Sequence, residues 1–413
     1  MAMARRNISH VSIGILSLAL LLGLGILPVA VIRPANAVTN TFQACDIFTA
    51  VSDGNINWYR PDTCPGIPSS VAFQGVLSGG SSYMTGMGFD EGSCNSAGVV
   101  GGIPNPNPGV PCMYATDFGT STILVFDNTG AMIGTCAPTG AGGAAVESVE
   151  AVEGTGGVAP GVIAGGPDFR ITSGGGAAIE TGPLPCGSAD ALTLHPATGG
   201  SGTGGTDWVD LSADKCTVLY TGEGFEIKSD NICTNTQNPD FLPADSLTGT
   251  AYALKILPDA SVIVAATGSV VHVSSGGVIT STCNTGSAGS GGLFSLDILP
   301  GGAAFATGSF GNNQIDYLTV AQCDAGQASP TFSFDGTSGD GAATGTVYGV
   351  AIFGEAEVVH TSTSTSTSTS TVQGVPEFGA GPGASTLFAA AIGIAAVAML
   401  LRLRKFPVQK PIP

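Results

Sequence analysis

Basic residues are scarce in this sequence, and their scarcity excludes a large class of partners. The chain has 413 residues, with 12 Lys and Arg against 30 Asp and Glu. Between residues 38 and 371, five basic residues stand against 29 acidic ones, which gives a formal net charge of −24. Nucleic-acid binding needs clustered Lys and Arg, so we expect no nucleic-acid partner. A surface this acidic suits a medium rich in salt or divalent cations.

The usual motifs of catalysis are also missing. The sequence contains no Gly-x-Ser-x-Gly elbow and no Cys-x-x-Cys pair. Its two Trp residues, Trp58 and Trp208, are too few for the stacking that a quinone-dependent dehydrogenase needs. No partner for His195, His272 or His360 can be identified from sequence spacing, so general-base catalysis has no candidate. We therefore predict that the protein is not an enzyme.

The N-terminal segment has the three parts of a secretory signal. Arg5 and Arg6 precede an almost uncharged apolar run at residues 11–31, and an Ala-Asn-Ala site follows at residues 35–37. This order predicts a signal peptide over residues 1–37, cleaved after Ala37. Because the apolar run is long, an uncleaved membrane helix is the alternative, and Pro28 within the run favours cleavage.

The C-terminal segment predicts a stalk and a membrane anchor. Thr and Ser alternate without a break near residues 361–371, within a predicted stalk at 355–374 that cannot bury a core. An apolar run at 385–401 is just long enough for a transmembrane helix, and the basic residues at 402–405 place the tail, 406–413, in the cytoplasm. We therefore expect the protein on the outer face of the cell membrane, anchored at its C-terminus.

A short motif lies between the stalk and the span. Pro376, Glu377, Phe378 and Gly379 precede the apolar run and its basic cluster, within residues 375–405. This arrangement resembles the archaeal PEFG-CTERM sorting signal. The resemblance implies processing by an archaeosortase, a membrane Cys transpeptidase, which would cleave near Pro376 and could pass the protein to a lipid anchor. An ordinary tail anchor is the alternative.

Repeats in the body of the chain predict an all-β fold. The segment Ala-Leu-Lys-Ile-Leu-Pro at residues 253–258 returns as Ser-Leu-Asp-Ile-Leu-Pro at 295–300, 42 residues later. Each is followed by a short apolar strand that ends in Ala-Thr-Gly, and a related unit begins near Val209. A period of this length, with alternating strands and Gly-rich turns, is typical of four-stranded propeller blades.

The two ends of the repeat region predict how the ring closes. The first unit, at residues 46–59, lacks an innermost strand, whereas the last, at 347–353, is an innermost strand alone. We therefore predict a β-propeller over residues 38–354, closed by three N-terminal strands and one C-terminal strand, which removes exposed edges. Innermost strands are expected near residues 87, 149, 209, 254, 296 and 350. This count predicts six blades, or seven if residues 187–206 contain another.

The blade pattern resembles the six-bladed propellers of the NHL, SMP-30 and streptogramin-lyase-like superfamily, over roughly residues 45–354. Lactonases and lyases of that superfamily gather metal-binding carboxylates and Asn, or a catalytic His, at one end of the central channel. The corresponding hairpins here carry Asp53, Asp117, Glu223 and Asn312, which form a candidate ligand face. Asp and Asn in β-turns more often accept local backbone hydrogen bonds, and no metal-ligand spacing is present.

Other residues of interest fall near the predicted strands. The acidic residues Glu147, Glu150 and Asp210 lie near innermost strands. His272 is expected on the surface in a third strand, and His195 in an insert. Further inserts are predicted at residues 96–110 and 197–206.

Ten cysteines lie in the exported region, and an even number in such a chain predicts disulfides. Aligning the blades places two pairs across equivalent hairpins and one at the base of an insert, and elimination leaves two more. The predicted pairs are Cys45–Cys64, Cys216–Cys233, Cys94–Cys112, Cys136–Cys186 and Cys283–Cys323.

Together these patterns predict a disulfide-stabilised propeller that acts as a non-catalytic binding or display module of the archaeal cell envelope. Its expected partners are the membrane, an archaeosortase-like enzyme and an envelope protein, glycan or cation. No cofactor is expected, and clustered carboxylates would bind Ca²⁺ weakly at most. The alternative function is a metal-assisted hydrolase or lyase.

Overall fold

The computed structural model describes most of the predicted propeller. The described residues are 41–90, 99–100, 103–104, 111–136, 146–152, 161–165, 177–183, 193–197, 206–234, 236–285, 292–327 and 329–354. The signal peptide, stalk, sorting motif, predicted span and tail lie outside these residues and stay predictions. Within the described residues, no helix is long and apolar enough to cross a membrane.

The described strands form six four-stranded sheets and one two-stranded sheet. Each large sheet is named below by its innermost strand. The β26 blade consists of β26 (Val347–Ile352), β1 (Ile47–Val51), β2 (Asn55–Pro61) and β3 (Val71–Ser78). The β4 blade consists of β4 (Met84–Asp90), β7 (Cys112–Asp117), β8 (Thr122–Asp127) and β9 (Met132–Cys136). The β10 blade consists of β10 (Ser148–Val152), β11 (Gly161–Gly165), β12 (Ala177–Pro183) and β13 (Thr193–Ala197).

The other three blades follow in chain order. The β14 blade consists of β14 (Val209–Leu211), β15 (Thr217–Tyr220), β16 (Lys228–Asn231) and β17 (Thr236–Gln237). The β18 blade consists of β18 (Ala251–Ile256), β19 (Val262–Ala266), β20 (Ser269–Val273) and β21 (Ile279–Cys283). The β22 blade consists of β22 (Leu293–Ile298), β23 (Ala304–Ser309), β24 (Gln314–Thr319) and β25 (Phe332–Asp335), with helix α2 (Val320–Asp324) between its last two strands. The small sheet pairs β5 (Val99–Val100) with β6 (Ile103–Pro104).

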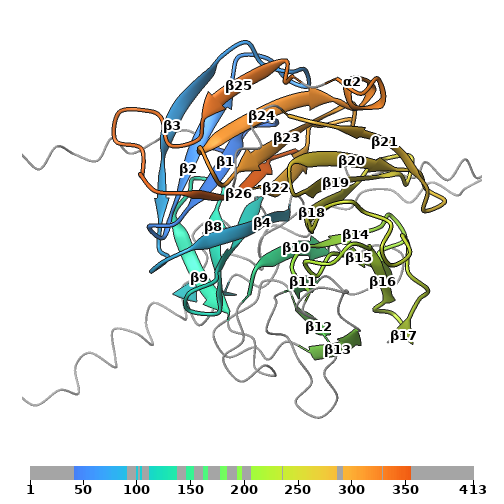
Figure 1. The fold of residues 1–413 in the computed structure, drawn as a ribbon. Coiled ribbons are helices and arrows are strands. Elements are labelled where there is room, and N and C mark those ends of the chain that lie inside the picture. The colour runs from blue at the N-terminus through green and yellow to red at the C-terminus, as the bar shows by residue number, and fades with distance from the viewer. Residues whose placement is uncertain are drawn as a thin grey trace, which may run out of the picture. The chain divides into compact units, whose positions relative to one another are not determined.

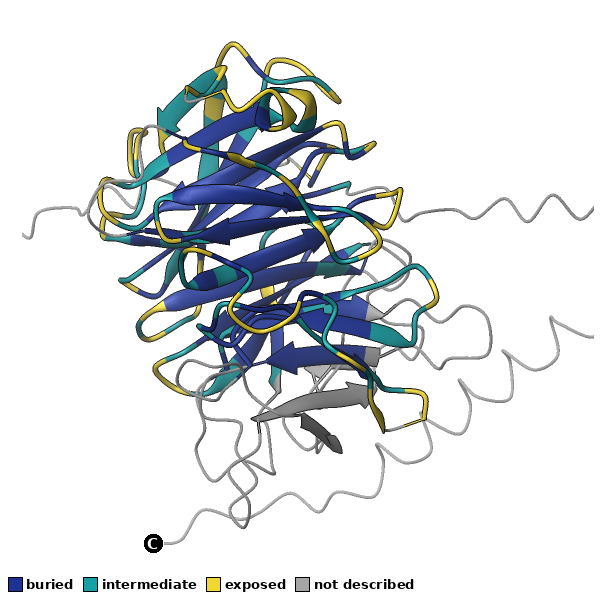
Figure 2. Cartoon of the chain, turned by 45° about the vertical axis from the view of Figure 1, so that its right-hand side comes forward, coloured by how far each residue is buried: buried dark blue, intermediate teal, exposed yellow. Residues whose placement is uncertain are grey.

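The blades form a closed ring, so the prediction of an all-β propeller is confirmed. Each innermost strand packs against the innermost strands of its two neighbours, in the cyclic order β26, β4, β10, β14, β18, β22. Figure 1 shows these strands near the centre, with β3, β25, β21, β17 and β13 toward the periphery. Buried residues follow the strands and exposed ones follow the connections (Figure 2).

The predicted closure is also confirmed. The C-terminal strand β26 pairs antiparallel with β1, with Ile352 opposite Ile47 and Ala351 opposite Phe48. The segment 187–206, which we considered for a seventh blade, contributes β13, the outermost strand of the β10 blade. The prediction that His195 lies in an insert is therefore wrong, because His195 pairs with Ile179 in that strand. The β5–β6 hairpin lies within the insert predicted at 96–110.

A buried group of aromatic side chains lies at the end of the propeller where the innermost strands β26 and β4 finish. We call Phe42, Phe48, Trp58, Phe89 and Phe353 the seam cluster, since it joins the first and last segments of the ring. Phe42 contacts Phe48, Trp58 and Phe353 with ring centroids 4.8–5.9 Å apart. Phe48 and Trp58 are 0% and 1% exposed. Such aromatic pairs add to the stability gained from apolar burial.

Three predicted disulfides are confirmed. They are Cys45–Cys64, Cys216–Cys233 and Cys283–Cys323, with Cα atoms 5.7, 5.2 and 4.9 Å apart. Cys112 is also disulfide-bonded, and its predicted partner, Cys94, lies outside the described residues. The predicted Cys136–Cys186 pair falls on side chains that the structure does not describe.

Candidate functional site

The four residues of the predicted ligand face all lie at one end of the ring. Asp53, Asp117, Glu223 and Asn312 each lie at or within the hairpin between the second and third strands of a blade. The innermost strands begin at this same end, which we call the mouth.

Three of these four side chains act locally. Asp117 accepts hydrogen bonds from the backbone N–H groups of Ser81 at 2.7 Å and of Gly119 at 3.1 Å. Asp53 and Asn312 accept from the N–H groups two residues further on, at 3.2 and 3.1 Å. These contacts are the ordinary ones of Asp and Asn in turns. Among the described residues, no group of three or more His, Cys, Asp or Glu side chains could hold a metal ion.

Aromatic side chains instead line most of the mouth. We call Tyr83, Tyr252, Phe294, Phe310 and Tyr348 the aromatic arc. Tyr252 stacks on Phe294 with ring centroids 4.4 Å apart, and Phe294 contacts Phe310 at 5.1 Å. Tyr348 contacts Phe310 at 5.0 Å and Tyr83 at 5.3 Å, so the rings form an unbroken row. Tyr83 is 46% exposed, and the other four are half-buried.

β-Bulges present three of these rings. In β18, Ala251 and Ala253 pair with consecutive residues of β19, which leaves Tyr252 as the extra residue. Phe294 and Tyr348 are the extra residues at the corresponding places in β22 and β26. A bulge turns a side chain away from the regular strand alternation, and bulges concentrate next to active sites. Three successive blades therefore direct an aromatic side chain to the mouth by the same backbone device.

The remaining two blades bring carboxylates to the mouth. Glu147 directly precedes β10, Asp207 lies two residues before the start of β14, and Glu223 lies in the β15–β16 hairpin. Asp207 is only 3% exposed, and neither of its carboxylate oxygens accepts a hydrogen bond. Burial, with smaller contributions from Glu147 and Glu223, raises the pKa of Asp207 to about 9. The backbone N–H of Glu223 makes the smallest contribution and lowers the pKa.

Hydrogen bonds connect this acidic half to both ends of the aromatic arc. Thr221, two residues before Glu223, donates its hydroxyl to the carbonyl oxygen of Tyr252 at 2.7 Å. On the other side, the N–H of Gly86 in β4 donates to the carbonyl oxygen of Glu147 at 2.7 Å. A Cβ atom on Gly86 would lie 2.5 Å from the Cα atom of Ser148, so only glycine permits this approach. All six blades thus contribute to the mouth. Four of them contribute aromatic side chains, and the other two contribute carboxylates.

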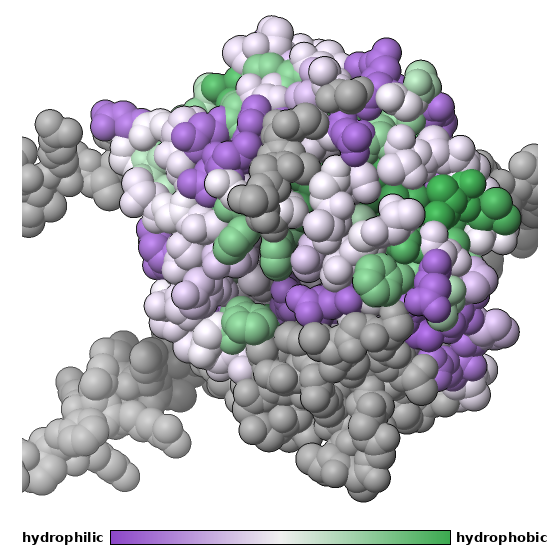
Figure 3. Space-filling view, in the orientation of Figure 1, coloured by the Kyte–Doolittle hydropathy of each residue, from purple (hydrophilic) through white to green (hydrophobic). Residues whose placement is uncertain are grey.

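Hydrophobic and hydrophilic side chains also lie side by side on the face of the molecule seen in Figure 3.

A buried lysine ties the innermost strands together toward the opposite end. Lys255 of β18 is 4% exposed, and its Nζ lies 3.3, 3.5 and 3.6 Å from carboxylate oxygens of Glu150, Asp210 and Asp297. These partners belong to β10, β14 and β22. Asp210 also accepts a hydrogen bond from Ile256 N–H at 2.6 Å, across to the next innermost strand. The predicted positions of Glu150 and Asp210 on innermost strands are confirmed, and their contacts hold the ring together.

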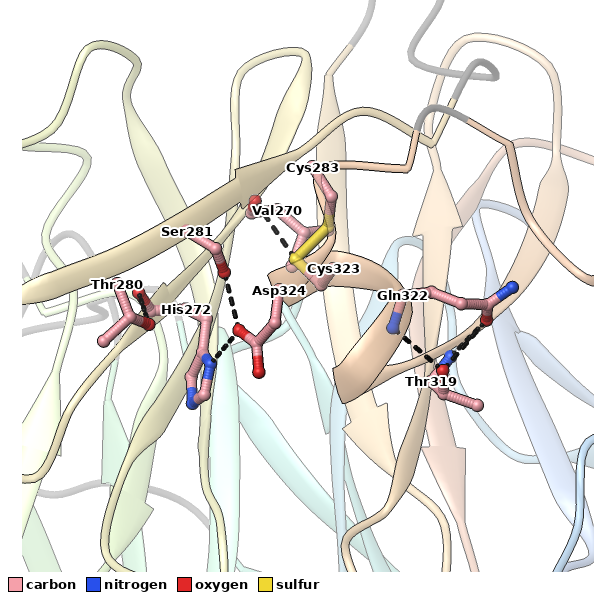
Figure 4. The surroundings of a disulfide bond; sticks show 9 residues. All are labelled: Val270, His272, Thr280, Ser281, Cys283, Thr319, Gln322, Cys323 and Asp324. Carbon is pink, nitrogen blue, oxygen red and sulfur yellow. Dashed lines mark hydrogen bonds and ion pairs between the residues drawn. A yellow bond between two sulfur atoms is a disulfide. The ribbon is translucent and has the colours of Figure 1, made fainter.

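The prediction that His272 lies on the surface is wrong. It is 8% exposed in β20, and its Nδ1 atom lies 2.7 Å from Asp324 Oδ1 in the neighbouring β22 blade. Asp324 follows Cys323 in α2, so the Cys283–Cys323 disulfide and the His272–Asp324 contact join the same two blades (Figure 4). We call these four residues the latch. The sequence pattern missed this contact because the two partners come from different blades.

The surroundings of His272 have the contact order of a catalytic triad. Its Nε2 atom lies 3.0 Å from Ser261 Oγ, with Asp324 on the other ring nitrogen. A nucleophilic serine gives its proton to the histidine and must reach the substrate. Here the Ser261 hydroxyl donates to Asp259 at 2.5 Å, and Ser261 is 4% exposed. The arrangement is therefore structural.

Sequence reasoning identified part of the mouth. It placed Glu147 near an innermost strand and Glu223 in a mouth hairpin, but it missed Asp207 and the whole aromatic arc. The signal was present in the repeats, since Tyr252, Phe294 and Tyr348 occupy the second position of three consecutive innermost strands. Aligning the blades by that position would have revealed the arc.

No protein-family model matches the chain, and no curated protein matches it. Among solved structures, a chain from the crystal structure of a nidogen/laminin complex matches with a TM-score of 0.53 at 10% identity, over 76% of this chain and 100% of that chain. The β-propeller domain of Myceliophteria thermophila Cps50 (Swd1) matches with a TM-score of 0.44 at 10% identity, over 72% and 89% of the two chains, which is too low to support an argument. At 10% identity, the likeness to the first structure concerns the fold alone.

Proposed function

We propose that this protein is an exported, non-catalytic binding module of the cell envelope, which holds its ligand at the mouth of the propeller. The observation that carries this proposal is the bulged aromatic residue of three successive innermost strands, Tyr252, Phe294 and Tyr348. A core residue needs no bulge, and a half-exposed row of rings leaves apolar surface in contact with water. Exposed apolar patches on soluble domains commonly mark binding sites.

Export and anchoring are part of the same proposal. Disulfides persist in oxidising compartments, and three of them lie in the described residues. An archaeal PEFG-type signal at residues 376–379 would then pass the protein to an archaeosortase-like transpeptidase, and the stalk would hold the ring away from the membrane. In this arrangement the ring is displayed to the outside. A metal-assisted hydrolase or lyase stays the alternative, although Asp53, Asp117 and Asn312 are occupied by local hydrogen bonds.

The test is recovery of the native ligand. The full-length protein would be purified from its own envelope, and the molecules that co-purify identified by mass spectrometry. The triple variant Tyr252→Ala, Phe294→Ala, Tyr348→Ala should lose the co-purifying molecule. The matched control Phe332→Ala truncates a half-buried ring on the outermost strand β25 and should keep it. If the folded triple variant retained the molecule as the wild type does, the mouth would not be the binding site.

A further inference from the structure

The mouth combines two features that separately attract positive charge. The face of an aromatic ring carries negative potential, which attracts a cation placed over it. The acidic half adds Glu147 and Glu223, whose charges act on buried Asp207. Three of the four described Lys and Arg residues form ion pairs elsewhere: Arg60 with Asp46, Lys228 with Asp240, and Lys255 with carboxylates in the channel.

We propose that the mouth binds a small organic cation of the alkylated ammonium class, with its apolar groups on the aromatic arc and its charge toward Glu147, Asp207 and Glu223. This inference rests on the proposed function, since it names the ligand class of the same site. The carboxylate of Asp207, 3% exposed and with no hydrogen bond to either oxygen, is the independent observation that points to a ligand. A buried carboxylate without a donor is costly, and a bound cation offsets that cost.

Two other ligand classes fit less well. A metal ion needs several oxygen ligands at short range, and the described residues contain no such group of carboxylates. A neutral ligand would cover the rings but would make no charge interaction with the acidic half. The charge of an alkylated ammonium ion acts over a longer distance than a coordinate bond, so this ion needs no close set of oxygen ligands.

Binding of a cation should be linked to proton release. Without ligand, Asp207 holds a proton at neutral pH, because its pKa is raised to about 9. A cation beside Glu147, Asp207 and Glu223 favours the ionised carboxylate and lowers that pKa. Affinity should therefore increase as the pH rises from about 6 to about 9, and each binding event should release part of a proton.

The experiment compares a cation with its neutral analogue. Full-length protein in a non-ionic detergent would be titrated in a calorimeter with choline and with 3,3-dimethylbutan-1-ol, which replaces the charged nitrogen by carbon. Sodium chloride would keep the ionic strength constant, and micelles alone would serve as the blank. We expect choline to bind at least about tenfold more tightly than the alcohol, a difference of about 1.4 kcal/mol. Titrations in two buffers of different ionisation enthalpy would measure the proton released.

Variants separate the two halves of the site. The triple variant Tyr252→Ala, Phe294→Ala, Tyr348→Ala and the double variant Glu147→Gln, Glu223→Gln should each weaken choline binding about tenfold. Asp207→Asn should abolish proton release, and Phe332→Ala should change nothing. Thermal unfolding would establish that each variant is folded.

Two outcomes would overturn the inference. Equal binding of choline and the neutral alcohol, lost in the triple variant, would show a mouth that binds ligands without selecting cations, and the proposed function would stand. No saturable choline binding in the millimolar range would reject the cation class, and recovery of the native ligand would then decide the proposed function independently.

Discussion

The seam cluster and the aromatic arc are built from the same kind of contact at opposite ends of the innermost strands, and they differ in burial. Ring centroids lie 4.8–6.4 Å apart in the seam-cluster contacts of Phe42, and 4.4–5.3 Å apart along the row of the arc. Phe48 and Trp58 are almost fully buried, whereas Tyr83 is 46% exposed. Ring geometry alone therefore does not separate a structural cluster from a binding surface.

Backbone geometry and neighbouring charge make the distinction. Phe48 pairs regularly with Trp58 between β1 and β2. The bulge beside Trp58 in the β2–β3 pairing leaves Gln74 as its extra residue, so it presents no aromatic ring. Trp58 donates its indole N–H to Asp46 at 2.8 Å. Tyr252, Phe294 and Tyr348 lie at bulges, at the same end of the propeller as Asp207, whose carboxylate oxygens accept no hydrogen bond. In the seam cluster, the indole N–H of Trp58 thus has its hydrogen-bond partner within the fold. At the mouth, the carboxylate of Asp207 accepts no hydrogen bond and can interact with a ligand. The comparison predicts opposite responses to the same kind of substitution.

Truncating the seam cluster should have the largest effect. Phe48→Ala removes a ring that is 0% exposed, and we expect a loss of about 3–5 kcal/mol in the free energy of unfolding. Guanidinium unfolding followed by fluorescence would measure it, since Trp58 lies in the same cluster. Phe332→Ala is the matched control and should cost clearly less. A loss below about 1 kcal/mol for Phe48→Ala would mean that this cluster does not hold the seam.

Removing the channel lysine should have the next largest effect. Lys255→Met leaves Glu150, Asp210 and Asp297 close together without their shared cation, at an expected cost of about 3 kcal/mol at pH 7. The cost should shrink at acid pH, as these carboxylates take up protons. Lys228→Met is the comparison: Lys228 pairs with partly exposed Asp240 and, at 3.8 Å, with buried Glu226, so two carboxylates instead of three lose their cation and the cost should be smaller. Equal losses for both variants would contradict a special role for Lys255.

Neutralising Asp207 should stabilise the protein. Because the pKa of this carboxyl is raised in the folded state to about 9, its folded form is favoured at low pH. That stability is fully present below the unfolded pKa, near 3.8, and is lost as the pH rises through about 9. Asp207→Asn should therefore gain about 1–3 kcal/mol at pH 8, and the gain should vanish near pH 4. Asp117→Asn is the contrasting variant and should lose stability, since Asp117 accepts several N–H groups. If Asp207→Asn instead destabilised the protein at pH 8, the ionised carboxylate would have a stabilising partner within the fold, which would contradict this prediction.

Truncating one ring of the arc should affect stability little and binding strongly. Tyr348→Ala removes a half-buried ring at a bulge, for which we expect a loss of about 1 kcal/mol. The same variant should weaken ligand binding several-fold, as measured by the choline titration. A stability loss as large as that of Phe48→Ala would erase the difference between the two clusters.

The smallest expected effect lies in the latch. Burial pulls the pKa of Asp324 upward, but hydrogen bonds from His272 and Ser281 lower it overall. A carboxyl with a lowered folded pKa contributes stability above its unfolded pKa and loses it as the pH falls through the folded value. Because Asp324 is 46% exposed, Asp324→Asn should cost only about 0.5 kcal/mol at pH 7, and less below pH 4. Thermal unfolding of both proteins at the two pH values would detect it, and a cost that grew at low pH would contradict it.

Features that follow from patterns along the sequence could be predicted, whereas contacts between different blades could not. The repeats at 253–258 and 295–300 predicted the blades, and the incomplete first and last units predicted the β26–β1 closure. Aligned positions also predicted Cys45–Cys64 and Cys216–Cys233, and elimination predicted Cys283–Cys323. By contrast, His272 was misplaced because its partner Asp324 comes from another blade. Lys255 was not singled out because three separate innermost strands supply its carboxylates.

What the sequence determined by itself is therefore the all-β repeat, the seam, the acidic charge and the signals expected at both ends. These follow from alternation, period and composition, which act along the chain. Only the tertiary structure decided which residues meet at the mouth. Tyr252, Phe294 and Tyr348 come together because three blades repeat one bulge around a ring. Asp207 becomes unusual only because folding buries it, so that water can no longer solvate its charge, and brings the charges of Glu147 and Glu223 to act on it.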